Sequence, residues 1–337
     1  MKRIAIVTGA SSGMGQWFAR TASEYVKFDQ LWIIARRADR LEALAAELGA
    51  AAAGAAAGDA AGAGTIAGAT AGAAAGDAAG DAAGTATGTA AGAGSVAGAA
   101  GATAGDAAGT ATGTAAGAGA SQEAPQASFE VRPVPMDLTS PQAIDSLAAL
   151  LKEEGGEVVL LVNAAGFGKF QAVMDVPQQA ACSMLQLNCE ALMNMCRTMV
   201  PFMKSGAKIL NIASVAAFQP VPYVTEYAAT KAFVLNFSRG LWKELRPQGI
   251  TVTALCPYWT RTEFFDVANN RDSKDRVSYF NAMYEPEDVV RRGWRDLMKG
   301  RDLSTFGFIA RAQVVLVKLL PHRLVMCIWC RQQKIKE

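Results

Sequence analysis

The chain alternates short apolar runs with helix-forming stretches, and this alternation restricts its possible folds more than any other feature. Apolar, strand-like runs occur at residues 4–7, 31–34, 129–135, 157–162, 208–212 and 251–255. Helical spacing of apolar residues occurs between them, at residues 14–27, 38–48, 141–153, 178–200 and 225–246. Buried strands that alternate with helices predict a parallel sheet with helices on both faces. We therefore predict an α/β fold, a doubly wound parallel sheet of the Rossmann type.

A low-complexity segment interrupts this alternation at residues 50–120. It consists of Ala, Gly, Thr and Asp apart from Ile66, Ser95 and Val96, and residues 80–94 recur as residues 105–119. Glycine weakens a helix by about 1 kcal/mol per residue relative to alanine. Almost no large side chain is present to form a core. We predict a disordered insertion, with a helix-packing array of small residues as the alternative.

The remaining residues have the length of one large domain. Residues 1–49 and 121–310 are predicted to form the Rossmann domain, with a lid over the substrate at 258–284. Residues 311–337 form a basic, amphipathic tail with six Lys or Arg residues and one Glu. Two interpretations of the tail stay open: a helix that covers the domain or a dimer partner, and a helix that rests on a membrane surface.

Composition excludes several classes of protein. The only histidine is His322, so a multi-histidine metal site is excluded and no metal is predicted. The net charge of +2 is too small and too dispersed to indicate nucleic-acid binding. The apolar run after Met1-Lys2-Arg3 is too short for a secretory signal, and no stretch has the ~18 apolar residues of a membrane span. We predict a cytoplasmic protein.

The first strand runs into a glycine-rich turn with the spacing G-x-x-x-G-x-G. Glycines allow the backbone to approach a pyrophosphate, and the following helix offers free N–H groups to it. The turn between a strand and a helix therefore predicts a dinucleotide site. Its predicted cofactor-binding residues are Gly9, Ser11, Ser12, Gly13, Met14 and Gly15.

The end of the second strand carries Arg36 and Arg37. An acidic residue at this position would bind the ribose 2′-hydroxyl of NAD, whereas arginines suit the 2′-phosphate of NADP. We predict that the chain binds NADP(H) in preference to NAD.

Ser214, Tyr227 and Lys231 form the strongest group of candidate catalytic residues. Tyr227 and Lys231 are four residues apart, so they share one face of a helix, and Ser214 follows a strand end. An unperturbed tyrosine has a pKa of about 10. A neighbouring ammonium is expected to lower the pKa of the tyrosine, so that its phenol can act as a general acid or base near neutral pH.

With these motifs, the chain resembles the short-chain dehydrogenase/reductase family over residues 3–48 and 129–301. The resemblance rests on the glycine turn, Asn163-Ala164-Ala165-Gly166 and the Ser214, Tyr227 and Lys231 set. It implies that Tyr227 is the general acid in carbonyl reduction. It also implies that Lys231 binds the nicotinamide ribose and that Ser214 orients the substrate oxygen.

The resemblance extends to five further residues. It implies that Asn188 holds a water in a proton relay to Lys231. It places Asp137 at the adenine and Thr262 at the nicotinamide carboxamide. Asn163 and Pro257 complete the implied cofactor-binding set.

Two departures narrow the resemblance. The family has a second asparagine where this chain has Ala164, and a glycine where this chain has Tyr258. Tyr258 narrows the nicotinamide side of the pocket. The Pro257-Tyr258 pair is similar to the branch of 17β-hydroxysteroid and long-chain 3-oxoacyl-CoA reductases.

The lid is rich in aromatic residues, which predicts a bulky, apolar substrate, although ordinary packing of a lid gives the same pattern.

Three cysteines recur every seven residues in the predicted helix at 178–200: Cys182, Cys189 and Cys196. This spacing indicates a stripe of the helix that packs against a neighbour rather than a metal site. In the family this helix and that of Tyr227 commonly form an interface, so a homodimer or homotetramer is expected.

The predicted function is NADP(H)-dependent interconversion of a ketone and a secondary alcohol, with a small-molecule substrate. Two alternatives stay open. One is a sensor or scaffold that binds NADP(H) without turnover, and the other is the same enzyme held at a membrane surface by its tail.

Overall fold

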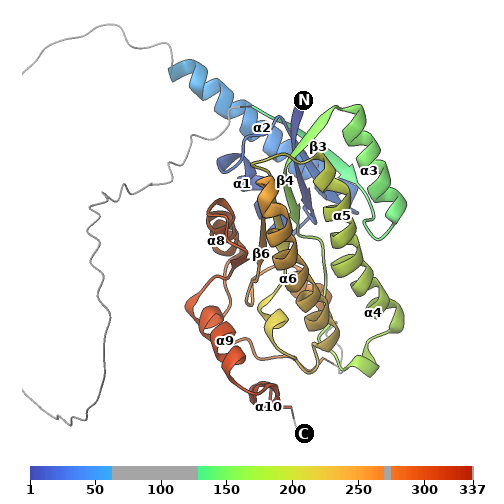
Figure 1. The fold of residues 1–337 in the computed structure, drawn as a ribbon, viewed down its shortest axis with the longest axis vertical. Coiled ribbons are helices and arrows are strands. Elements are labelled where there is room, and N and C mark those ends of the chain that lie inside the picture. Colours follow the sequence, from blue (N-terminus) through green and yellow to red (C-terminus); the bar gives the residue numbers. More distant parts are fainter. Residues whose placement is uncertain (63–127, 269–274, 336–337) are drawn as a thin grey trace, which may run out of the picture. The chain divides into compact units, whose positions relative to one another are not determined.

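The computed structural model describes residues 1–62, 128–268 and 275–335, which form one packed unit. A single seven-stranded sheet lies at its centre, and every neighbouring pair of strands is parallel, in the order β3-β2-β1-β4-β5-β6-β7 (Figure 1). The strands are β1 Lys2–Thr8, β2 Gln30–Ala35, β3 Glu130–Pro135, β4 Gly156–Asn163, β5 Lys208–Ile212, β6 Thr251–Leu255 and β7 Leu303–Ser304. The predicted doubly wound Rossmann sheet is confirmed.

Helices connect the strands. The α-helices are α1 Gly13–Thr21, α2 Ala38–Gly62, α3 Pro141–Glu153, α4 Gln178–Leu185, α5 Leu192–Met199, α6 Thr225–Leu245, α7 Phe264–Ala268, α8 Pro286–Met298, α9 Phe308–Leu319 and α10 His322–Gln332. Short 3₁₀ turns are η1 Ala22–Glu24, η2 Val173–Asp175, η4 Val200–Phe202, η5 Val215–Phe218 and η6 Arg246–Gln248, and η3 Gln186–Ala191 is a π-helical turn.

Two hydrophobic cores lie on opposite faces of the sheet, because successive side chains of a strand point to opposite sides. In β1, Ile4 and Ile6 pack into the core that contains residues of α3, α5 and α6. Ala5 and Val7 pack into the other core, with residues of α1, α2 and α8. Helices therefore cover both faces, as the apolar runs predicted.

Three elements differ from the sequence-based prediction. Helix α2 continues to Gly62, well past residue 48, because its alanines favour helix at little entropic cost. The predicted helix at 178–200 is broken by the π-helical turn η3. Strand β7 was not predicted, since its two residues, Leu303 and Ser304, are too short for a pattern and depend on pairing with β6. The low-complexity residues from 63 onward lie outside the described residues.

The parallel register brings several strand ends to one edge of the sheet. Thr8 lies opposite Asn163, Asn163 lies opposite Asn211, and Ile212 lies opposite Leu255. The residues that follow these strands, which include the predicted site residues, therefore meet along this edge.

Candidate active site

The glycine turn is pressed against the end of β4. Gly9 has a φ of +68°, and a β-carbon there would lie 2.7 Å from the carbonyl carbon of Ala164. A β-carbon at Gly15 would overlap the carbonyl of Gly9. The hydroxyl of Thr8 accepts hydrogen bonds from the backbone N–H groups of Ala164 at 3.1 Å and Ala165 at 3.3 Å. Glycine is thus required at position 9 for the turn to approach the residues after β4, and at position 15 for the turn itself to close.

A cleft of about 510 Å³ follows the carboxyl ends of β1, β2 and β4. It is lined by ten of the predicted cofactor-binding residues: Gly9, Ser11, Ser12, Gly13, Met14, Gly15, Arg36, Arg37, Asp137 and Thr262. The cleft combines a glycine turn at a helix N-terminus with arginines at one end, so its donors fit an extended, anionic nucleotide.

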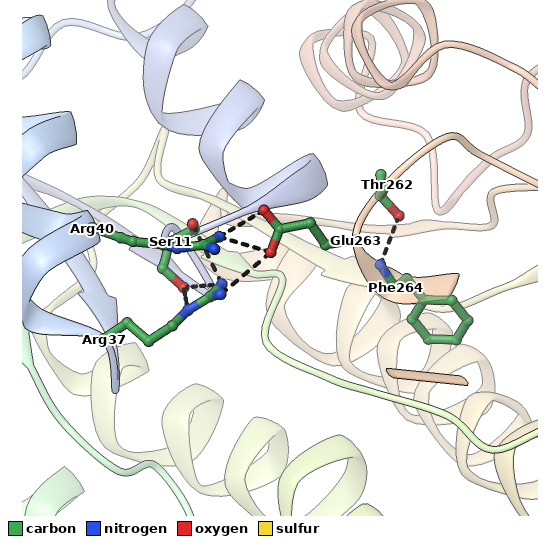
Figure 2. A network of polar contacts seen from close by, with 6 residues as sticks. All are labelled: Ser11, Arg37, Arg40, Thr262, Glu263 and Phe264. Carbon is green, nitrogen blue, oxygen red and sulfur yellow. Dashed lines mark hydrogen bonds and ion pairs between the residues drawn. The ribbon is translucent and has the colours of Figure 1, made fainter. Parts of the chain in front are cut away.

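Two arginines at this cleft are held by one carboxylate, as Figure 2 shows. Arg37 donates hydrogen bonds to the hydroxyl of Ser11 at 3.0 and 3.3 Å, and its Nη1 lies 3.3 Å from Glu263. Arg40 Nη1 lies 2.6 Å from Glu263 Oε1. Burial opposes the ionisation of Glu263, but the hydrogen bonds from Arg40 and Arg37 outweigh it and lower its pKa. No local pattern marks Glu263 as a site residue, because it lies more than 220 residues from both arginines.

Asp137 and Arg36 lie along the same cleft. The carboxylate of Asp137 accepts hydrogen bonds from the backbone N–H of Thr139 at 3.0 Å and from its hydroxyl at 2.8 Å. These bonds, above all the one from the backbone, lower the pKa of Asp137, and the charge of Arg36 adds to the effect. Asp137 is therefore a fixed anion at the side of the cleft.

The predicted catalytic residues meet in a second cavity of about 120 Å³. Ser214, Tyr227 and Lys231 all line it, and the hydroxyl of Ser214 acts on Tyr227, whose pKa it lowers against the larger effect of burial. Lys231 Nζ lies 5.6 Å from the centroid of the Tyr227 ring and donates a hydrogen bond to the carbonyl of Ile212 at 2.8 Å. Strand β5 and helix α6 thus bring the serine, the phenol and the amine together.

Asn188 lies beside these residues, fully buried in the π-helical turn η3. Its side chain accepts a hydrogen bond from the N–H of Phe167 at 3.0 Å and donates to the carbonyl of Phe167 at 2.8 Å. A β-carbon at Gly166 would lie 2.9 Å from Asn188 Oδ1 and 3.5 Å from Lys231 Nζ. The polar ends of Asn188 and Lys231 therefore converge at Gly166, and π-helical turns are frequent at functional sites.

Burial dominates the protonation of the phenol and the amine. It raises the pKa of Tyr227 to about 12, although the hydrogen bond with Ser214 acts in the opposite direction. It lowers the pKa of Lys231 to about 8. The pKa of Tyr227 is therefore raised and not lowered, contrary to the expectation, because the cost of placing charge in the buried site dominates and Lys231 does not offset it.

Two predicted cofactor residues lie outside the nucleotide cleft. The side chain of Asn163 points into the core, where it donates to Asn211 at 2.9 Å and to the sulfur of Cys196 at 3.4 Å. Asn163 lines neither cavity, because strand alternation turns its side chain to the buried face. Pro257 lines the catalytic cavity instead of the cleft.

The tail contributes residues to the catalytic cavity, which the sequence did not predict. Gln313 of α9 and Trp329 of α10 both line it. The indole N–H of Trp329 donates to the carbonyl of Pro222 at 2.9 Å, and its ring stacks on Trp259 at 6.3 Å. The tail thus covers the domain, in agreement with one of its two interpretations.

In the described part of the chain, no helix has the length and apolarity to cross a bilayer, and no cluster of metal-ligating side chains occurs.

Residues 85–273, more than half of the chain, match the family model for short chain dehydrogenases. The chain belongs to the short-chain dehydrogenase family. It is an oxidoreductase, and its likeness to an uncharacterized oxidoreductase of Staphylococcus aureus agrees with this. The two are 29% identical over 166 residues, which cover 49% of this chain and 68% of that protein.

Solved short-chain dehydrogenases share the fold. The enzyme from Sphingobium yanoikuyae, in complex with NADPH, is 22% identical with a TM-score of 0.60, and the match covers 97% of this chain and 96% of that one. The enzyme from Burkholderia phymatum, in complex with NAD, is 18% identical with a TM-score of 0.62 and coverage of 94% and 92%. Members with this fold thus bind either nucleotide.

Proposed function

We propose that this short-chain dehydrogenase interconverts a ketone and a secondary alcohol with NADP(H). One observation carries the proposal: the catalytic cavity and the nucleotide cleft adjoin. Both are lined by the same five residues, Met14, Ala164, Gly166, Thr262 and Phe264. A substrate carbonyl beside Tyr227 would therefore lie next to the end of a nucleotide in the cleft.

The chain's own residues manage the proton and the substrate oxygen. When bound, a nicotinamide cofactor supplies or accepts the hydride. Tyr227 donates its proton to the carbonyl oxygen, and its raised pKa keeps that proton in place at neutral pH. Ser214 orients the oxygen through the hydroxyl that faces Tyr227, and Asn188 and Lys231 form the polar wall behind Gly166.

The raised pKa of Tyr227 predicts opposite pH dependences for the two directions. Reduction needs the protonated phenol, so its kcat/KM is expected to stay flat between about pH 5 and 7, a range that lies below the pKa of about 8 of Lys231. Oxidation needs the phenolate, whose fraction grows with pH below the pKa, so its kcat/KM rises through the same range. Steady-state assays of both directions measure this. A reduction rate that falls across this range would show that Tyr227 loses its proton near neutrality.

Arginine chemistry supports the preference for NADP(H). Arg37 lines the cleft, and Arg40 lies beside it through Glu263, which also lines the cleft. A phosphate monoester is the anion that best matches such guanidinium groups. In this structure the carboxylate of Glu263 accepts hydrogen bonds from the guanidinium groups of both Arg37 and Arg40 (Figure 2). A 2′-phosphate would have to replace the carboxylate as their partner.

Glu263→Gln is therefore expected to lower the Kd for NADPH by about two- to fivefold, the range for an exposed ion pair. The Kd for NADH, which lacks the phosphate, stays unchanged. Isothermal titration with both nucleotides measures the effect. The control is Glu285→Gln, since Glu285 pairs with the exposed Arg261 at 3.0 Å outside the cleft. Weaker binding of both nucleotides in Glu263→Gln would show instead that the ion pairs of Glu263 with Arg37 and Arg40 stabilise the bound nucleotide.

Aromatic packing around the lid supports a bulky, apolar substrate. Phe170 contacts Trp259, Phe264 and Phe265 at ring distances of 5.8–6.1 Å, and all four line the catalytic cavity. An NADPH-oxidation screen across steroids, 3-oxoacyl thioesters and small ketones tests the proposal, and binding of NADPH without turnover would favour the sensor.

A second candidate places the same enzyme on a membrane surface. Exposed apolar side chains on α9 and α10 favour it, including Phe308 and Leu319, which are 85% and 76% exposed. Vesicle flotation of the full chain and of a Phe308→Ser, Leu319→Ser variant separates this candidate from the unattached enzyme.

A cytoplasmic homodimer or homotetramer remains part of the proposal. Two apolar side chains suit such an interface: Leu185 of α4, which is 54% exposed, and Phe233 of α6, which is 39% exposed.

A further inference from the structure

A third cavity adjoins the catalytic cavity on the side of the tail. It has a volume of about 420 Å³ and lies between the lid and helices α9 and α10. Five residues line both cavities: Gln219, Tyr258, Trp259, Gln313 and Trp329. These five residues, here called the shared wall, place the third cavity, here called the outer groove, directly beside the cavity that contains Tyr227.

The outer groove is uncharged, mostly apolar in surface and open to solvent. None of its described lining residues is Lys, Arg, Asp or Glu. Phe308, Leu316 and Ile328 line it and are 85%, 52% and 41% exposed. A hydrocarbon chain is the ligand whose burial on such a surface is favourable without any charged partner.

The shared wall holds one buried acceptor without a donor. Gln219 is only 9% exposed, and its Oε1 has no hydrogen-bond partner among the described residues. Two other polar groups of the wall are already engaged, because Tyr258 donates to Asn281 at 2.7 Å and Trp329 donates to Pro222 at 2.9 Å. A buried acceptor that lacks a donor is costly, and a ligand N–H or O–H would remove that cost.

We propose that the substrate is an extended, amphipathic ketone with a hydrogen-bond donor in the middle of its chain. Its carbonyl lies at Tyr227, its hydroxyl or amide N–H donates to Gln219, and its hydrocarbon end fills the outer groove. Gln219 is then a specificity-determining residue. This inference rests on the proposed function and narrows its substrate class.

Ligand binding tests the inference without turnover, because Trp259 and Trp329 in the shared wall report it through intrinsic fluorescence. The full chain is titrated with 2-tridecanone and with a set of hydroxy-2-tridecanones. These hydroxyketones are positional isomers of one another, and each carries a single hydroxyl at a different mid-chain carbon. At least one isomer is expected to bind about fivefold or more tightly than the parent ketone. Gln219→Leu is expected to abolish that gain and to leave the affinity for 2-tridecanone within about twofold.

Two further variants make the result specific. Gln219→Met repeats the test with a longer apolar side chain, in case Leu disturbs the fold. Gln248→Leu makes the same change at an exposed position that lines none of the three cavities, and it is expected to keep the gain.

The inference is overturned if no isomer binds more tightly than 2-tridecanone, if no ketone binds, or if the gain survives in both Gln219 variants. The proposed function fails in a different way. A hydroxyketone that binds through Gln219 but is never reduced with NADPH would contradict the enzymatic activity and leave the binding site intact.

Discussion

Replacing Tyr227 with phenylalanine is expected to lower kcat for ketone reduction by about 10²- to 10⁴-fold, the usual contribution of a positioned general acid. The variant keeps the ring that packs against Phe264 at 5.3 Å, so the cavity wall is preserved. It loses only the phenolic hydroxyl, the group that would donate the proton. Steady-state NADPH oxidation measures kcat, and titration calorimetry is expected to give an unchanged Kd for NADPH.

Tyr258→Phe is the matched control for this loss. Tyr258 lines the same cavity, but its hydroxyl donates to Asn281 rather than facing Ser214. Its removal is expected to change kcat by less than about tenfold, since it removes a hydrogen bond and no proton donor. Equal losses in Tyr227→Phe and Tyr258→Phe would mean that the cavity needs hydroxyl groups for packing, and would remove the special role of Tyr227.

Replacing Arg37 with glutamine is expected to raise the Kd for NADPH by about 10- to 100-fold at low salt. Hydrogen bonds to a charged group contribute about 1.5–3 kcal/mol, and about 1.4 kcal/mol corresponds to tenfold in Kd. The Kd for NADH is expected to change by less than about threefold, because the lost guanidinium served the 2′-phosphate. Calorimetric titration with the two nucleotides measures both values.

Arg20→Gln controls for the general loss of a positive charge. Arg20 forms an ion pair with Glu47 at 2.8 Å and does not line the nucleotide cleft. Its replacement is expected to leave both dissociation constants unchanged. An equal rise in the Kd of NADPH and NADH for Arg37→Gln would contradict the assignment, and the same measurement on Arg36→Gln would show which arginine selects the phosphate.

Local pattern was sufficient to predict the sheet and most of the site. Buried strands and the glycine turn leave short-range signals, since Gly9 must be glycine where the turn meets the residues after β4, and Gly15 must be glycine where the turn closes on itself. The spacing of Tyr227 and Lys231 on one helix gives their proximity directly. Ser214 follows because parallel strands end at one edge of the sheet.

Features that depend on distant contacts were not predictable. Glu263 reaches Arg37 and Arg40 only after the sheet has formed, and β7 exists only because β6 pairs with it. Strand alternation turned Asn163 into the core, against the family resemblance. The pKa of Tyr227 followed burial, a property of the packed site rather than of the Tyr-x-x-x-Lys spacing.

Hydride transfer can be followed most directly with NADPH that carries deuterium at the transferable position of its nicotinamide ring. The enzyme and a ketone found in the screen are incubated with this cofactor, and the product is examined by mass spectrometry. One deuterium is expected on the carbinol carbon of the alcohol, and none in the Tyr227→Phe reaction over the same time. An alcohol without deuterium, or bound NADPH that is never oxidised by any ketone, would contradict the proposed reaction.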